Sequence, residues 1–120
     1  MQVPILKQGD FLIATIQAAL TDNDLRSFRT ELFEYVIRAR SRGIIIDVTA
    51  LDVLDSFGTR TLSEIAIMTR LRGAETVIVG VQPEVAFAMV QLGLTLEGVA
   101  TALDLEEGLA QLNRKSKGLV

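Results

Sequence analysis

The residues that could do chemistry are concentrated between positions 47 and 56. Asp47 lies near the end of an apolar run, and Asp52 and Asp55 follow in a polar stretch. Ser56 comes directly after Asp55. Carboxylate oxygens suit Mg²⁺, and a serine hydroxyl can accept a phosphoryl group. These residues therefore indicate either a divalent-metal site or a modified serine.

The composition narrows this chemistry, because the sequence contains no Cys and no His. Thiolate metal sites, cysteine nucleophiles and a Ser-His-Asp triad are thereby excluded. A small enzyme or ligand-binding domain that uses Asp47, Asp52 or Asp55 remains an alternative. No glycine-rich phosphate loop accompanies these carboxylates, so a solvated acidic loop explains them more simply. We predict no enzymatic activity, no catalytic residues, no metal and no cofactor.

Length and charge suggest a single globular domain. The chain has 120 residues, of which 49% are hydrophobic and 22% charged, and we expect one domain over residues 1–120. Its net charge of −3 has the wrong sign for sequence-independent binding of nucleic acid. The first residues do not form a signal peptide, and no apolar run is long enough to span a bilayer. The sequence therefore predicts a cytoplasmic protein that binds neither nucleic acid nor membranes.

The apolar pattern predicts a mixed β-sheet covered by helices, an α/β fold. Residues 3–6 and 11–16 are short apolar segments around a turn-like Gln8-Gly9-Asp10, which indicates a hairpin. Residues 44–48 and 76–81 are continuous apolar runs, which is typical of strands buried on both faces. The expected order is β-β-α-β-α-β-α-β-α, with a short edge strand at 99–102.

Helix ends are predicted from capping chemistry. Thr21 is a good N-cap for the first helix, and Gly43 is a natural residue to follow its end. Arg38, Arg40 and Arg42 would complement the negative end of that helix dipole. Three further helices are expected at about 57–72, at 84–92 and after Asp104. Gly73 and Gly93 would end the first two of these, and the last would bury Leu105, Leu109 and Leu112 on one stripe.

Ser56 lies where a strand and loop lead into a helix. Either Asp55 or Ser56 can cap that helix, and ordinary capping is the simplest explanation of the pair. A phosphate there would add a charge of about −1.5 to −2, and free backbone N–H groups at a helix start could accommodate it. The fold would then survive phosphorylation while a partner docked over Ser56 would be repelled.

The helix after Ser56 has two apolar faces. One face is expected to meet the sheet and consists of Gly58, Leu62, Ile65, Ala66 and Thr69. The other consists of Phe57, Ile67, Met68 and Leu71. This second face is either a docking surface or is covered by the first helix and neighbouring loops. The helix at 84–92 has almost no polar face, so it is either deeply buried or part of a protein interface.

The segment 44–48 followed by Leu54-Asp55-Ser56-Phe57-Gly58 resembles the central motif of STAS domains. The predicted order of strands and helices also resembles the STAS fold, over essentially the whole chain. Within that family the chain is most similar to the RsbS-type stressosome antagonists. The segments that carry this closer likeness are 3–7, 55–57, 80–83, 90–93 and 101–106. Phe57 departs from the Asp-Ser-Ser-Gly or Asp-Ser-Ala-Gly more common in direct anti-sigma-factor antagonists.

The resemblance implies a phosphorylation-controlled scaffold. Such proteins sequester a serine/threonine switch kinase, assemble with themselves and with larger STAS-containing sensor paralogues, and are reset by a PP2C-type phosphatase. Ser56 would be the phosphoacceptor, with Thr59 as a second, weaker candidate. The expected kinase-docking residues surround the helix start and are Asp55, Phe57, Gly58, Thr59 and Met68. A stand-alone anti-sigma-factor antagonist, controlled through the same serine, is the alternative.

Overall fold

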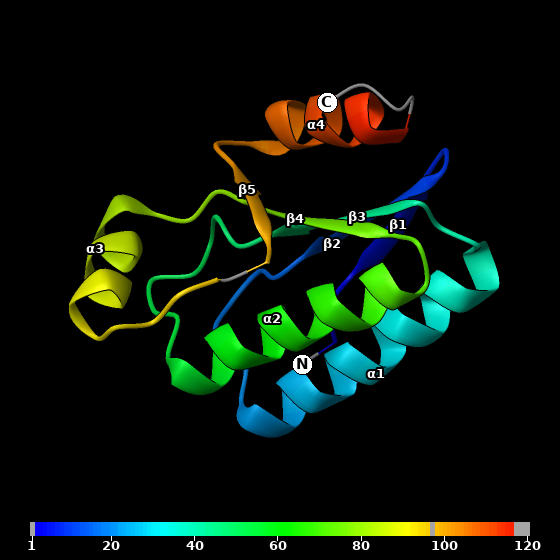
Figure 1. Cartoon of the computed structure of the whole chain (residues 1–120). Helices are drawn as coiled ribbons and strands as arrows, with labels where there is room; N and C mark the ends of the chain where they lie inside the picture. The colour runs from blue at the N-terminus through cyan, green and yellow to red at the C-terminus, as the bar shows by residue number, and fades with distance from the viewer. Residues whose placement is uncertain (1, 97, 117–120) are drawn as a thin grey trace.

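A five-stranded mixed sheet forms the centre of the computed structural model, which describes residues 2–96 and 98–116 (Figure 1). Its strands stand in chain order and are β1 (Ile5–Gln8), β2 (Phe11–Thr15), β3 (Gly43–Asp47), β4 (Glu75–Val79) and β5 (Ala100–Ala102). β1 pairs antiparallel with β2, and every later pair is parallel. The predicted mixed sheet and the predicted order of elements are confirmed.

The helices cover the two faces of the sheet unequally. They are α1 (Asp22–Ala39), α2 (Ser56–Leu71), α3 (Pro83–Gln91) and α4 (Leu105–Ser116). α1 and α2 lie side by side on one face, α4 lies alone on the other, and α3 stands beyond the end of the sheet (Figure 1). None of these helices is both long and apolar enough to cross a bilayer.

The strands β3 and β4 are buried on both faces, as their continuous apolar sequence predicted. Ile44 and Ile46 join the larger core cluster, together with Phe28 and Leu32 of α1 and Leu62 of α2. Ile45 points to the opposite face and packs in a smaller cluster with Val77, Val79 and Leu112. Each central strand therefore packs against helices on both faces of the sheet.

Several predicted caps and turns are confirmed. Thr21 and Asp24 form a capping box at the start of α1. Asp104 accepts a hydrogen bond of 2.9 Å from the backbone N–H of Glu107 at the start of α4. Gly73 and Gly93 both have the positive φ that suits a residue just beyond a helix. These local signals correctly located the helix ends.

The predicted role of Gly43 is wrong. α1 ends at Ala39, and Arg40 adopts the left-handed conformation of the C-cap, with φ 50°. Gly43 instead belongs to β3, where a Cβ atom would lie 2.8 Å from a methyl carbon of Leu112. The glycine therefore allows α4 to approach the sheet closely. Leu105, predicted on the buried stripe of α4, is 37% exposed at the edge of that packing.

Candidate functional site

The loop between β3 and α2 is fixed at its start by hydrogen bonds. The Asp47 carboxylate accepts bonds from the backbone N–H and the hydroxyl of Thr49, at 2.9 and 2.6 Å. The Gln82 side-chain amide, at the start of α3, donates to the Thr49 carbonyl oxygen at 2.7 Å. This loop is therefore tied both to its own strand and to the neighbouring β4–α3 connection.

Asp55 is the N-cap of α2. Its backbone is extended, and its carboxylate Oδ1 accepts a hydrogen bond of 2.8 Å from the Gly58 N–H. Ser56 is then the first residue of the helix, and its side chain is exposed. In the part of the chain that the structure describes, the Ser56 hydroxyl makes no hydrogen bond. Of the two capping candidates, Asp55 therefore caps the helix, whereas the side chain of Ser56 is accessible.

Arg26 of α1 stands beside the start of α2. Its guanidinium carbon lies 5.0 Å from the centre of the Phe57 ring, within range of a cation–π interaction. The Arg26 side chain also donates to the Asn23 side-chain oxygen at 2.9 Å. A positive charge therefore lies next to the residue that follows Ser56. Arg26 could not be found from the sequence, because an exposed arginine in the second turn of one helix gives no signal that it meets another.

The structure divides the predicted docking residues into accessible and buried ones. Asp55 is exposed, and Phe57 and Met68 are half-buried. Gly58 and Thr59 are buried, because their phase on α2 turns them toward the core. Thr59 is only 4% exposed, and its hydroxyl has no hydrogen-bond partner among the described residues. In this conformation Gly58 and Thr59 offer a docking partner no surface, and the Thr59 hydroxyl is shielded from a kinase.

The outer face of α2 is uncovered toward the end of the helix. Leu71 is 83% exposed and Ile67 is also exposed, whereas Phe57 and Met68 are partly covered. The predicted second apolar face thus divides into a partly covered portion and a free one. α3 likewise buries Val85 and Met89 but leaves other apolar side chains exposed, so it is not deeply buried.

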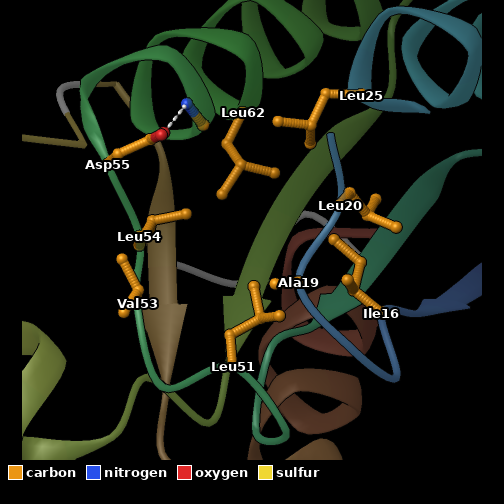
Figure 2. A pocket seen from close by; sticks show the side chains of 10 residues that line it. Ile16, Ala19, Leu20, Leu25, Leu51, Val53, Leu54, Asp55 and Leu62 are labelled. Atoms are coloured by element: carbon orange, nitrogen blue, oxygen red, sulfur yellow. Dashed lines mark hydrogen bonds between the residues drawn. The ribbon is translucent and has the colours of Figure 1, made fainter. Parts of the chain in front are cut away.

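A small apolar cavity of about 90 Å³ lies beside the capped start of α2 (Figure 2). Its walls come from the β2–α1 loop, from α1, from the loop before α2 and from α2 itself. The lining side chains are Ile16, Ala19, Leu20, Leu25, Leu51, Val53, Leu54, Asp55 and Leu62, with Gly58. Asp55 alone among them is charged, so the hollow suits an apolar group rather than an ion.

The carboxylates singled out in the sequence are not assembled into a metal site. Asp47 is engaged with Thr49, and Asp55 caps α2. Over residues 2–96 and 98–116, no group of three or more His, Cys, Asp or Glu side chains is placed to hold a metal ion. The structure therefore does not support the alternative in which Asp47, Asp52 and Asp55 form a shared ligand set.

The order of the strands and helices is that of a known class of domain. The STAS domain family matches residues 2–108, and the chain belongs to this family. The structure is similar to a variant of RsbS from Moorella thermoacetica, with a TM-score of 0.84 and 37% identity, covering 98% of this chain and 99% of that one. A chain in a structure of the stressosome, described as a signal integration and transduction hub, is 38% identical, with a TM-score of 0.78 over 95% of this chain and 99% of that one.

Relatives of known name are found in Bacillus subtilis (strain 168). RsbT co-antagonist protein RsbRD is 31% identical over 118 residues, which is 98% of this chain and 42% of that protein. RsbT co-antagonist protein RsbRA is 32% identical over 78 residues, which is 65% of this chain and 28% of that protein. The chain spans less than half the length of these curated relatives.

Proposed function

We propose that this chain is a non-enzymatic stressosome scaffold that sequesters a serine/threonine switch kinase in the cytoplasm and releases it when Ser56 is phosphorylated. The observation that carries the proposal is the position of Ser56, which is exposed and is the first residue of a helix that Asp55 already caps. The likeness to RsbS over nearly the whole chain supports the same role.

The local electrostatics favour a switch of binding over a switch of folding. A phosphate on Ser56 would lie at the positive end of the α2 dipole, near backbone N–H groups that have no partner within the helix. Asp55 would keep its bond to Gly58, because that cap does not use the Ser56 hydroxyl. The added charge would nevertheless sit among Asp52 and Asp55, with Arg26 as the nearby positive group. The folded chain would thus tolerate a phosphate that an apolar or acidic partner surface would not.

The assembly and its reset complete the proposal. The relatives in Bacillus subtilis carry the name RsbT co-antagonist, which supports larger STAS-containing sensor paralogues as partners of this chain. Self-association fits the likeness to a chain of the stressosome. A PP2C-type phosphatase would remove the phosphate and restore kinase binding. Particle sizing of the co-expressed proteins separates this role from that of a stand-alone anti-sigma-factor antagonist, which would remain small.

Phosphosite mapping combined with kinase binding tests the proposal. The full chain is incubated with the cognate switch kinase and ATP, and the phosphate is located by mass spectrometry. We expect modification at Ser56, kinase binding that survives in Ser56→Ala, and at least about tenfold weaker binding in Ser56→Asp. Ser27→Asp, which adds the same charge on an exposed position of α1, is the matched control and should bind the kinase normally. Unchanged kinase binding by Ser56→Asp would contradict the proposal.

A further inference from the structure

The C-terminal part of the chain has a one-sided charge distribution. Between Gly73 and Asn113 the sequence contains no Lys or Arg, and all its charged residues are acidic. Glu84 in α3, and Asp104 and Glu106 around the start of α4, are exposed. A partner that docks on this part of the molecule is therefore favoured if it is basic.

An apolar groove of about 340 Å³ lies within this acidic region, between α3 and β5. Val90 of α3 and Leu103, just after β5, line it and are 77% and 78% exposed. Phe87 on α3 and Leu92 just after it are also exposed apolar side chains, but they do not line the groove. We call Val90, Leu103 and the groove that they line the groove face. Isolated exposed apolar side chains are ordinary, but a group around a groove marks an interaction surface.

The complementary surface occurs on α2 of the same chain. Ile67 and Leu71 are exposed, and they follow one another at the i, i+4 spacing that places two side chains on one helix face. Arg60 and Arg72 are exposed on the same helix and at its C-cap, whereas the exposed Arg70 guanidinium already donates to the Gly98 carbonyl oxygen of its own chain. Glu64 is the acidic residue of this stretch, and its carboxylate already pairs with Arg29 at 2.9 Å. Ile67, Leu71, Arg60 and Arg72 form what we call the α2 ridge, which combines two apolar side chains with two arginines.

We propose that the groove face of one copy receives the α2 ridge of a second copy. A helical ridge with two apolar side chains fits an apolar groove. The arginines of the ridge would face the exposed carboxylates of Glu84, Asp104 and Glu106. Apolar burial would supply most of the affinity, since exposed ion pairs contribute little. The inference rests on the self-association in the proposed function, but not on Ser56 or the kinase.

The two surfaces lie on different elements, so this contact is heterologous. Each copy in a bound pair keeps one unused groove and one unused ridge. Such a contact propagates into a ring or an open chain of subunits, unlike a symmetric dimer that closes on itself. A heterologous contact and a symmetric dimer can therefore be distinguished by mixing two variants that each lack a different surface.

Sedimentation velocity of the full chain over a range of concentrations tests the proposal. We expect concentration-dependent association of the unmodified chain, weakened by added salt because the charges on both surfaces are exposed. Val90→Glu places a charge in the groove, and Leu71→Glu places a charge on the α2 ridge. Each variant should associate at least about tenfold more weakly than the unmodified chain. Leu6→Glu, at a β1 position that is 66% exposed, is the matched control and should associate normally. Circular dichroism checks that all variants stay folded.

Mixing the two interface variants is the decisive measurement. The Val90→Glu chain keeps its ridge and the Leu71→Glu chain keeps its groove, so the mixture should form a one-to-one complex that does not grow. A mixture that stays monomeric, or either variant associating as strongly as the unmodified chain, would overturn the proposed contact while leaving self-association intact. If the unmodified chain stays monomeric at every concentration, the proposed self-association is wrong as well. That result would not affect the proposal that the chain binds a kinase.

Discussion

At the scale of single residues, Asp55 and Ser56 differ in role, although either residue type could cap the helix. Both are good capping residues, and both precede or begin the helix. The structure gives the cap to Asp55, through its bond to the Gly58 N–H, and leaves the Ser56 hydroxyl accessible. The capping carboxylate and the accessible hydroxyl therefore belong to neighbouring side chains, and substitutions can separate their effects.

Asp55→Ala should lower the free energy of unfolding by about 1 kcal/mol, because it removes the N-cap of α2. Ser56→Ala should change it by less than about 0.5 kcal/mol, because the exposed hydroxyl makes no hydrogen bond to any residue that the structure describes. Asp55→Asn is the control that retains a capping oxygen and should recover most of the loss. Urea unfolding of the three variants measures these differences, and a Ser56→Ala variant as destabilised as Asp55→Ala would mean that the serine shares the cap.

Thr59 gives a second prediction at this scale. Its buried hydroxyl has no partner within residues 2–96 and 98–116, so Thr59→Val removes an unsatisfied polar group at nearly constant shape. We expect stability to stay the same or to rise by up to about 1 kcal/mol. Thr69 is the matched comparison, because its buried hydroxyl donates to Ile65 and contacts the Thr76 hydroxyl at 2.9 Å. Thr69→Val should cost about 1–3 kcal/mol by leaving Thr76 unpaired, and equal losses in both variants would contradict this account of Thr59.

At the scale of elements, the close contact between two loops positions α2. Gly80, at the end of β4, has a φ of +81°, and a Cβ atom there would lie only 1.9 Å from the Thr49 hydroxyl oxygen. Thr49 in turn is held by Asp47 and by Gln82. The β3–α2 loop therefore takes its path against the β4–α3 connection, and a side chain at position 80 would displace it.

Gly80→Ala should destabilise the chain by about 3 kcal/mol, combining the left-handed backbone with steric overlap. Gly73→Ala is the control, because Gly73 has the same φ but nothing within 4 Å of its would-be Cβ. That variant should lose only about 1 kcal/mol, from the backbone alone. Thermal and urea unfolding compare the two. Adding Thr49→Ala to Gly80→Ala should recover part of the extra loss, because it removes the hydroxyl oxygen but leaves the Thr49 Cβ position, 3.0 Å from the new methyl group. Equal losses for the two glycine variants would show that the loop adapts.

The elements also show which features the sequence could predict. Strands, helices and the caps at Thr21 and Asp104 depend on residues close together in the chain, so their local signals were sufficient. Gly43 was misplaced because its role depends on Leu112, which reaches it only after the chain has folded. The candidate site follows the same division. The start of a helix at Asp55 and Ser56 could be predicted, although not which of the two caps it. The Arg26 contact and the apolar cavity could not, because they join segments that are distant in sequence.

At the scale of the whole molecule, the sheet depends on α4 for one entire face. α1 and α2 share the larger core cluster, but the smaller cluster on the opposite face is closed by α4 (Figure 1). Gly108 shows how closely that helix packs, since a Cβ atom there would lie 2.7 Å from a Val79 methyl carbon. A change in α4 should therefore affect stability without touching Ser56 or the start of α2.

Leu112→Ala tests this dependence. The side chain is 2% exposed and packs with Phe11, Ile45 and Val77, so we expect a loss of about 2–4 kcal/mol from lost burial and the cavity left behind. Leu105→Ala removes the same group about two turns earlier on the same helix, where it is 37% exposed, and should cost about 1 kcal/mol or less. Urea unfolding gives both values.

In the fraction that stays folded, Leu112→Ala should still present Ser56 to the kinase, because the helix that carries the serine lies on the opposite face. Similar losses for the two leucines would mean that α4 does not close the second face, and impaired phosphorylation of folded Leu112→Ala would mean that the two faces are coupled.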